Sequence, residues 1–157
     1  MDAPKQIIKQ EQIEVCERLE EVKWPEDACF IVDRDLPREL IDALPGEAVI
    51  FVRAGEGLKS LVRMDGLAEE VLAVRSTKPL TLIAVGGGSV GDAVGFLASV
   101  LWRGVRLWHV PTTLLAMVDS AHGGKTAVNL SGAKNQLGTF YTADRVVIVR
   151  ERRRIIR

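Results

Sequence analysis

The sequence predicts an α/β domain in which one mostly parallel sheet is covered by helices on both faces. Short apolar segments rich in β-branched residues alternate along the chain with segments whose apolar residues recur at helical spacing, an alternation typical of βαβ units. At residues 82–95 an apolar strand turns directly into a helix through three consecutive glycines. The 157 residues suffice for one domain with a single core.

The first part of the chain is expected to begin with a helix and to continue with alternating strands and helices. Val15, Leu19 and Val22 recur at helical spacing, so residues 6–22 are expected to form a helix that ends before Pro25. Strands are then expected at residues 28–32 and 48–52, and helices at residues 36–44 and 58–74.

The second part of the chain continues the alternation on both sides of the glycine-rich turn. Strands are expected at residues 80–85, 105–110 and 146–149, and helices at residues 89–101 and 114–118. The segment that follows, up to about residue 140, is polar and rich in glycine, and no element is assigned to it. We therefore divide the chain into an N-terminal extension (1–27), an α/β core (28–149) and a basic tail (150–157).

Composition describes an ordinary soluble globular protein, with 47% hydrophobic and 27% charged residues. Because 21 basic residues balance 21 acidic ones, the charge favours neither nucleic acid nor an anionic membrane as a partner. No apolar run reaches the roughly 18 residues of a membrane span, and the N-terminus is not a secretory signal. Cys16 and Cys29 lack C-x-x-C spacing and fit a reducing cytoplasm. His109 and His122 are not spaced as ligands on one helix, so no metal site is predicted.

The turn at residues 86–91 fits G-x-G-x-x-G between a predicted strand and a predicted helix. Glycine lets the backbone approach a ligand closely, and the free N–H groups and positive dipole end of a helix start suit a pyrophosphate. The motif therefore predicts a dinucleotide site in a Rossmann-like domain, with a ligand-free tight turn as the alternative. An acidic residue usually follows about 20 residues later to bind the ribose. Residues 106–111 contain none, so the ribose must be held from elsewhere.

Polar or glycine residues follow four successive predicted strands, at the edge where parallel sheets bind ligands. They are Asp33 and Asp35, residues 55–59, residues 86–92, and Thr112 with Thr113. Farther along, residues 119–138 bring together an aspartate, two lysines and two asparagines. The lysines suit phosphate groups as compact charges, with solvated loop residues as the alternative. The sequence GGKT at residues 123–126 lacks the first P-loop glycine and a preceding strand, which excludes a P-loop nucleoside triphosphatase.

Seven motifs occur in an order that resembles the N-terminal half of the 3-dehydroquinate synthases, a family of sugar-phosphate cyclases. They are GExxK at residues 55–59, GGGSVGD at 86–92, RG at 103–104, PTTLL at 111–115, DS at 119–120, GGKT at 123–126 and KN at 134–135. The resemblance extends from about residue 48 to residue 149. Iron-type alcohol dehydrogenases share the glycine-rich turn, but the lysine-bearing block between residues 119 and 135 favours the dehydroquinate branch.

The resemblance implies a role for each matching residue. Those implied to contact NAD are Glu56 and Lys59 at the adenosine ribose, Gly87, Gly88, Ser89, Val90, Gly91 and Asp92 around the pyrophosphate and neighbouring ribose, and Thr112, Thr113 and Lys134 alongside. Those implied to act on substrate are Asp119 at its hydroxyls, Lys125 and Asn135 at the substrate and its phosphonate-like end, and Arg103 at the phosphate bound to a neighbouring subunit. His122 departs from the family pattern and is interpreted as a structural residue.

The family reaction converts 3-deoxy-D-arabino-heptulosonate 7-phosphate to 3-dehydroquinate and phosphate, in the shikimate pathway of aromatic amino acid biosynthesis. It implies NAD, a divalent zinc or cobalt ion, a sugar phosphate substrate and a homodimer. The family's metal ligands belong to a helical C-terminal domain, which is absent from these 157 residues, so the isolated chain is expected to be inactive. Two alternatives remain open: a stand-alone nucleotide-binding or regulatory module, and a related cyclase of secondary metabolism.

Overall fold

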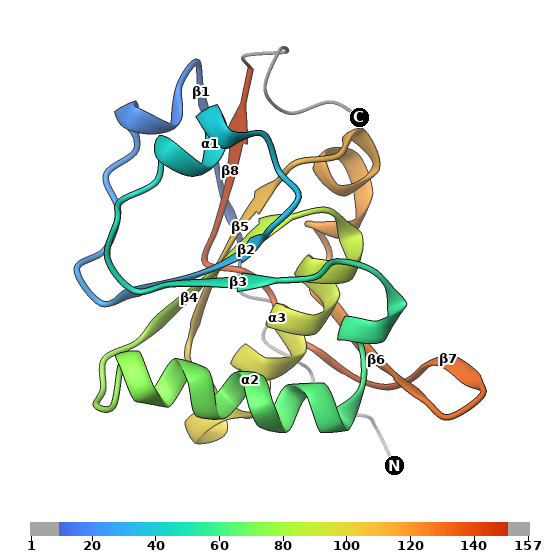
Figure 1. Ribbon diagram of the computed structural model, residues 1–157. Coiled ribbons are helices and arrows are strands. Elements are labelled where there is room, and N and C mark those ends of the chain that lie inside the picture. The colour runs from blue at the N-terminus through green and yellow to red at the C-terminus, as the bar shows by residue number, and fades with distance from the viewer. Residues whose placement is uncertain (1–9, 151–157) are drawn as a thin grey trace.

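Six parallel strands form the central sheet of the computed structural model, which describes residues 10–150 (Figure 1). Their order across the sheet is β1-β8-β5-β4-β2-β3. The strands are β1 (Gln12–Cys16), β2 (Ala28–Asp33), β3 (Val49–Val52), β4 (Thr81–Gly86), β5 (Arg106–Pro111) and β8 (Arg145–Val149). A separate antiparallel hairpin consists of β6 (Lys125–Leu130) and β7 (Ala133–Phe140).

Helices cover both faces of the sheet, which confirms the predicted Rossmann-like α/β architecture. One face carries α2 (Leu61–Val74) and α3 (Gly88–Val100), and the other carries α1 (Arg38–Asp42) and the 3-10 turn η1 (Leu19–Glu21). Ser60 is the N-cap of α2, and its side chain accepts a hydrogen bond from the Arg63 amide and caps the first turn. Short helical turns complete the fold: η2 (Glu56–Leu58), η3 (Leu101–Arg103) and the π-helix η4 (Ala116–Ser120).

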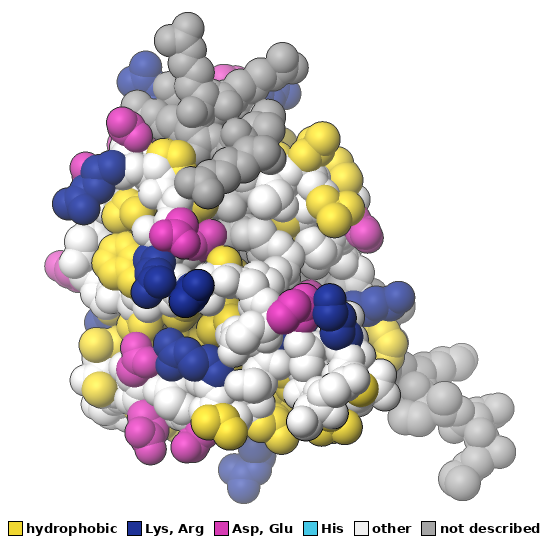
Figure 2. All heavy atoms as spheres, turned by 45° about the vertical axis from the view of Figure 1, so that its right-hand side comes forward, with side chains coloured by type: hydrophobic (Ala, Val, Ile, Leu, Met, Phe, Trp, Pro, Cys, Tyr) yellow, Lys and Arg dark blue, Asp and Glu magenta, His cyan; other side chains and the backbone are white. Residues whose placement is uncertain are grey.

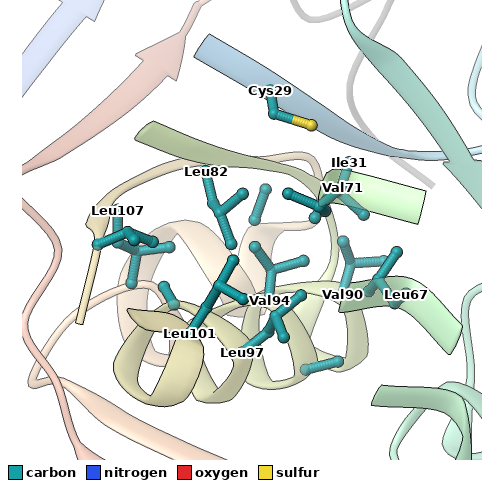
Figure 3. Packing of buried hydrophobic residues seen from close by; sticks show 14 of the residues in the cluster. Cys29, Ile31, Leu67, Val71, Leu82, Val90, Val94, Leu97, Leu101 and Leu107 are labelled. Carbon is teal, nitrogen blue, oxygen red and sulfur yellow. The ribbon is translucent and has the colours of Figure 1, made fainter. Parts of the chain in front are cut away.

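Alternate residues of each central strand enter two separate cores, because side chains of a strand point to opposite faces. In β2, Ile31 packs under α2 and α3, whereas Phe30 and Val32 pack on the α1 side. Figure 3 shows Val90 and Val94 of α3 directed toward the sheet on the first side. Burial on both faces explains why these strands read as continuous apolar runs.

The strand order reverses between β2 and β4, because β3 lies outward of β2 whereas β5 and β8 lie on the other side of β4. Ligands of such sheets bind at this switch point, beyond the carboxyl ends of the strands. The glycine-rich turn follows β4 at this position.

Two parts of the chain differ from the sequence prediction. Residues 12–16, within the helix expected at 6–22 and the range assigned to an N-terminal extension, form the edge strand β1, which pairs with β8. Alternation of Ile13 and Val15 with polar neighbours fits a strand equally well, and pairing with β8 decides between the two patterns. The segment left unassigned before residue 140 forms the hairpin β6–β7. Residues 6–9 of the expected helix and 151–157 of the basic tail lie outside the described residues.

Candidate functional site

The glycine-rich turn places the backbone at the start of α3 in very close contact with its surroundings. Gly87 is the N-cap of α3, and no side chain caps this end of the helix. A Cβ atom at Gly86 would lie 2.8 Å from Val90, one at Gly87 3.0 Å from Thr113, and one at Gly88 3.3 Å from the Ser120 hydroxyl. Larger residues would therefore crowd the turn. The uncapped amides and the helix dipole make it suited to an anionic ligand.

Two threonines close the turn from the side of β5. The amide of Thr112 donates to the Gly86 carbonyl over 2.9 Å, so the buried Thr112 continues the pairing of β4 with β5. The hydroxyl of Thr113 accepts from the Ala116 amide over 3.2 Å, the capping bond expected of a threonine before a helix. The predicted contact residues Thr112 and Thr113 thus lie beside the glycines.

The loop between β3 and α2 closes the turn from the opposite side. The amide of Gly55 donates to the Ser89 hydroxyl over 2.9 Å. Gly55 takes φ 118°, a backbone conformation that side chains rarely permit. Residues 53–58 and Arg63 line a hollow of about 490 Å³ beside this loop, which includes Glu56. Of the predicted strand ends, the loop after β3 and the threonines after β5 therefore both contact the start of α3, which itself follows β4.

Lys59 is a buried cation at the centre of the site. Its ammonium donates to Asp92 Oδ2 over 2.9 Å and to Asn135 Oδ1 over 2.6 Å, and only 4% of the side chain is exposed. Burial raises the pKa of Asp92, and the Lys59 ammonium offsets this effect in part. Lys59 thus joins the helix α3 to the hairpin, with both hydrogen bonds directed to protein groups.

A second set of bonds joins the hairpin to Glu56. Asn129 Nδ2 donates to Glu56 Oε2 over 2.6 Å, and Asn129 Oδ1 accepts from the Asn135 amide over 2.8 Å. The Asn129 hydrogen bond lowers the pKa of Glu56, and Lys59 and Lys134 lower it further, so this exposed carboxyl stays ionised at neutral pH. Lys134 is itself exposed on β7.

A cleft of about 510 Å³ opens between α3, η4 and the hairpin, a size typical of small-molecule sites. It brings together four predicted site residues, Asp92, Asp119, Lys125 and Asn135. Asp119 and Lys125 are exposed, so their charges face solvent at the edge of the cleft. The cleft thus offers an acceptor for hydroxyl groups beside a cation for an anionic group.

Arg103 and Val90 occupy positions apart from these groups. Arg103 ends η3, beyond the C-terminus of α3, and is exposed there. A 13-residue helix is roughly 20 Å long, so this end lies far from the glycine turn. The side chain of Val90 is fully buried in the core (Figure 3), which leaves only its backbone available to a ligand.

Two histidines lie near the cleft without forming a ligand cluster. His122 lines the cleft, with Nδ1 2.6 Å from Glu11 Oε1, and its Nε2 donates to the Met117 carbonyl over 2.7 Å. Burial disfavours its charged form, but these two hydrogen bonds and the negative charges of Glu11 and Asp119 together outweigh burial and raise the pKa of His122. His109 is buried behind Gly91, and burial lowers its pKa to about 4. His122 thus links η4 to Glu11, just before β1, and its structural role stays a prediction.

Sequence reasoning missed the part that Asn129 plays in the site, together with the cleft residues Ser120, Thr139 and Phe140. A signal for the hairpin was present. Val128 and Leu137 belong to two segments joined at Ser131 and Gly132, a turn dipeptide between residues of mixed polarity. Because the segment is polar and rich in glycine, the sequence analysis assigned no strands to it.

The side chains of the described residues also bear on metal binding. Among residues 10–150, no group of three or more His, Cys, Asp or Glu side chains could hold a metal ion, so these residues do not fit the implied zinc or cobalt.

Basic and acidic side chains are interspersed on the face in Figure 2, without an extended area of one sign. No helix in the described part of the chain has the length and apolarity to cross a membrane.

Fold and topology together define a Rossmann-like α/β domain. The family model described as 3-dehydroquinate synthase N-terminal matches residues 49–153. The chain belongs to the 3-dehydroquinate synthase family.

Relatives named 3-dehydroquinate synthase are similar over most of the chain. The one from Dictyoglomus turgidum is 38% identical over 138 residues, which are 85% of this chain and 39% of that protein. The one from Pyrobaculum neutrophilum is 50% identical over 101 residues, which are 62% of this chain and 29% of that protein. The chain spans at most 39% of the length of these relatives.

Solved structures of sugar-phosphate cyclases share the fold. A 2-deoxy-scyllo-inosose synthase, complexed with carbaglucose-6-phosphate, NAD+ and Co2+, has a TM-score of 0.77 and 32% identity, over 90% of this chain and 42% of that one. The 2-epi-5-epi-valiolone synthase of Streptomyces hygroscopicus, with NAD+ and Zn2+ bound, has a TM-score of 0.73 and 28% identity, over 95% of this chain and 45% of that one. An iron-containing alcohol dehydrogenase at 14% identity, with a TM-score of 0.68, shares the fold alone.

Proposed function

We propose that this chain is the NAD-binding part of a 3-dehydroquinate synthase, the enzyme that converts 3-deoxy-D-arabino-heptulosonate 7-phosphate to 3-dehydroquinate and phosphate. The observation that carries the proposal is the convergence of the β3–α2 loop, the glycine turn and Thr113 around the uncapped start of α3. Two cyclases of the same fold are described with NAD+ bound, which supports the assignment.

The residues around α3 fit a dinucleotide. Backbone amides of Gly88 and Ser89 would face the pyrophosphate, because no side chain caps the helix start, whereas the Gly91 amide already donates to the Gly87 carbonyl. Glu56 would accept hydrogen bonds from the adenosine ribose. It would thereby replace the acidic residue that usually follows the glycine motif and that residues 106–111 lack. NAD supplies a hydride acceptor when bound. The ion pair between Lys59 and Asp92 would keep the β3–α2 loop and α3 in place beside the ribose.

The cleft residues would bind the sugar phosphate. Asp119 would accept hydrogen bonds from substrate hydroxyls, and Lys125 would pair with an anionic end of the substrate. Asn135 would orient the substrate from the hairpin, where Lys59 holds its side-chain oxygen. Cationic groups beside a departing phosphate favour its release electrostatically.

The remaining assignments extend beyond the cleft. We propose a homodimer in which the exposed Arg103 contacts the substrate phosphate bound to the other subunit. We also propose a cytoplasmic location, which is consistent with the free thiols of the buried Cys16 and Cys29. Because residues 10–150 do not fit a metal ion, the 157-residue chain is expected to bind NAD without turning over substrate. Phosphate release by this chain with substrate, NAD+ and Zn2+ or Co2+ would contradict that expectation.

Calorimetric titration of NAD into the chain tests the proposal. Gly88→Val should weaken binding at least about tenfold, because a side chain there meets Ser120 and blocks the backbone approach. Glu56→Ala should weaken it less, through loss of the ribose contact. Gly46→Ala is the matched control, since a Cβ there meets nothing within 4 Å. Equal affinity in all four proteins would refute the assignment.

A related cyclase is the second candidate, because a 2-deoxy-scyllo-inosose synthase shares the fold at 32% identity over 90% of the chain. Isothermal titration of the NAD-loaded chain with heptulosonate phosphate and with glucose 6-phosphate distinguishes the two. Binding of neither, together with NAD binding, would favour a nucleotide-binding module without catalysis.

A further inference from the structure

The side chain of Asn129 contacts two segments to which the proposed function assigns different tasks. Its Nδ2 donates to Glu56 Oε2 over 2.6 Å, on the side expected to bind the cofactor. Its Oδ1 accepts from the Asn135 amide over 2.8 Å, on the side expected to bind substrate. One amide group therefore spans the distance between a cofactor contact and a substrate contact.

The orientation of this amide is determined by its partners. The ionised carboxylate of Glu56 can only accept a hydrogen bond, and the backbone N–H of Asn135 can only donate one. A flipped amide would place an oxygen against the carboxylate and an NH₂ group against an N–H. The Asn129 backbone adds a third bond, from its N–H to the Lys59 carbonyl over 2.8 Å. Asn129 is therefore held from the backbone and from both ends of its side chain.

Asn135 is held by the same network at two points. Asn129 binds its backbone N–H, and Lys59 binds its Oδ1 over 2.6 Å. Asn135 takes φ 56°, a left-handed conformation in which asparagine is more common than most other residues. Both of its anchors connect to the β3–α2 loop, since Asn129 bonds Glu56 and the Lys59 carbonyl.

We propose that Asn129 is a positioning residue that fixes the substrate-side Asn135 relative to the cofactor-side Glu56. The inference rests on the proposed function for the tasks of those two residues. Asn129 is not among the residues that line the cleft or the hollow beside the β3–α2 loop, and it acts through its two partners. A displacement of Glu56 on the cofactor side would therefore be transmitted to Asn135 on the substrate side through the Asn129 amide.

Two variants separate the two bonds. Asn129→Ala removes both, whereas Asn129→Asp keeps an oxygen for the Asn135 amide and sets a carboxylate against Glu56. The exposed Gln136 on the same hairpin, whose Nε2 donates to the Lys134 carbonyl, offers matched controls. Gln136→Ala controls for truncation, and Gln136→Glu controls for the added charge. Amide hydrogen exchange at Asn135, NMR titration of the Glu56 carboxyl and NAD calorimetry are measured on all five proteins.

Asn129→Ala should speed exchange at Asn135 about tenfold, return the pKa of Glu56 toward its ordinary value and weaken NAD binding several-fold. Asn129→Asp should leave Asn135 protected but weaken NAD binding more than Gln136→Glu does. NAD affinity in Asn129→Asp equal to that in Gln136→Glu would mean that Asn129 only supports the hairpin, and would overturn the inference. Unchanged exchange and Glu56 titration in Asn129→Ala would overturn it as well.

Failure of the proposed function gives a different result. If the unmodified chain does not bind NAD, the assignment of the cofactor site is wrong. Exchange at Asn135 and titration of Glu56 need no ligand, so they still decide whether Asn129 couples the two residues. The double variant Glu56→Gln/Asn129→Asp restores the bond between the two side chains with donor and acceptor exchanged. It should therefore keep Asn135 protected and remove the repulsion between the two carboxylates of Asn129→Asp.

Discussion

At the scale of single residues, the site depends on polar groups that satisfy one another away from water. Lys59 is the clearest case, because its buried ammonium has Asp92 and Asn135 as partners. A buried ion pair adds little net stability over apolar replacements, but removal of one partner leaves the other without compensation. The pair therefore makes the arrangement of α3 and the hairpin specific.

Lys59→Met should destabilise the fold by about 2 kcal/mol, because Asp92 and Asn135 lose their shared donor in a partly buried site. Urea unfolding measures the change. Asp92→Asn keeps an acceptor for Lys59 and should cost less, and Lys59→Met/Asp92→Asn completes a double-mutant cycle. Strictly additive losses would show that the two side chains do not interact.

The two histidines should respond to pH in opposite directions. The raised pKa of His122 means that its stabilising contribution is complete below about pH 6.5 and is lost as the pH rises through the folded-state value. The pKa of His109, lowered to about 4, means that its contribution is complete above about pH 6.5 and is lost as the pH falls toward 4. NMR titration of both rings measures the two values directly.

Variants assign each pH effect to one ring. Thermal unfolding of His122→Gln should lose the stability decline above pH 6.5, and it should keep the decline on acidification that belongs to His109. Titration of His109 near 6.5 in the folded protein would contradict its burial behind Gly91.

At the scale of elements, the hairpin β6–β7 carries Lys125 and Asn135, which are proposed to bind substrate, and Lys134, which is proposed to contact NAD. It packs on α3 and connects to the β3–α2 loop through Asn129. The closeness of its two strands is set at Gly138, where a Cβ would overlap the Thr126 carbonyl oxygen. The hairpin therefore needs glycine at this position for packing.

Gly138→Ala should destabilise the protein by about 2 kcal/mol, because the added methyl group separates β6 from β7. Hydrogen exchange should locate the loss of protection in residues 125–140, with α2 unaffected. Gly46→Ala, where a Cβ meets nothing within 4 Å, should be neutral or slightly stabilising. Equal stability of the two variants would contradict the packing shown for the hairpin.

At the scale of the whole molecule, both thiols report on global unfolding. Cys29 lies inside the sheet and Cys16 at the end of the edge strand β1, and both are buried. Burial raises the pKa of each thiol to about 11. Their cooperative exposure would show that β1 belongs to the same folding unit as the central strands.

A thiol reagent at pH 8 should label the folded chain at least about a hundredfold more slowly than the unfolded chain, since few thiolates form. Cys29→Ser and Cys16→Ser separate the two rates. Cys16 should react first, because it is 7% exposed on an edge strand whereas Cys29 is fully buried. Rapid labelling of Cys29 in native buffer would contradict its place in the core.

The sequence was sufficient for the parts of the fold that depend on local patterns. The strands around residues 28–32, 48–52, 80–85, 105–110 and 146–149 and the two long helices follow from apolar periodicity and match the structure in type. The π-helix η4 stands where a short helix was expected. Two elements required long-range pairing: β1 exists because it pairs with β8, more than 130 positions later, and β6–β7 because α3 and the β3–α2 loop hold it.

By itself, the sequence determined that the chain is a parallel α/β domain with a glycine turn before a helix, because turn chemistry and periodicity act over a few residues. It also marked Glu56, Lys59, Asp92 and Asn135 as polar groups of interest. Only the tertiary structure decided that these four meet, with Asn129 between two of them. Hydrogen bonds between residues 33 to 76 positions apart depend on how strands are ordered, which no local pattern encodes.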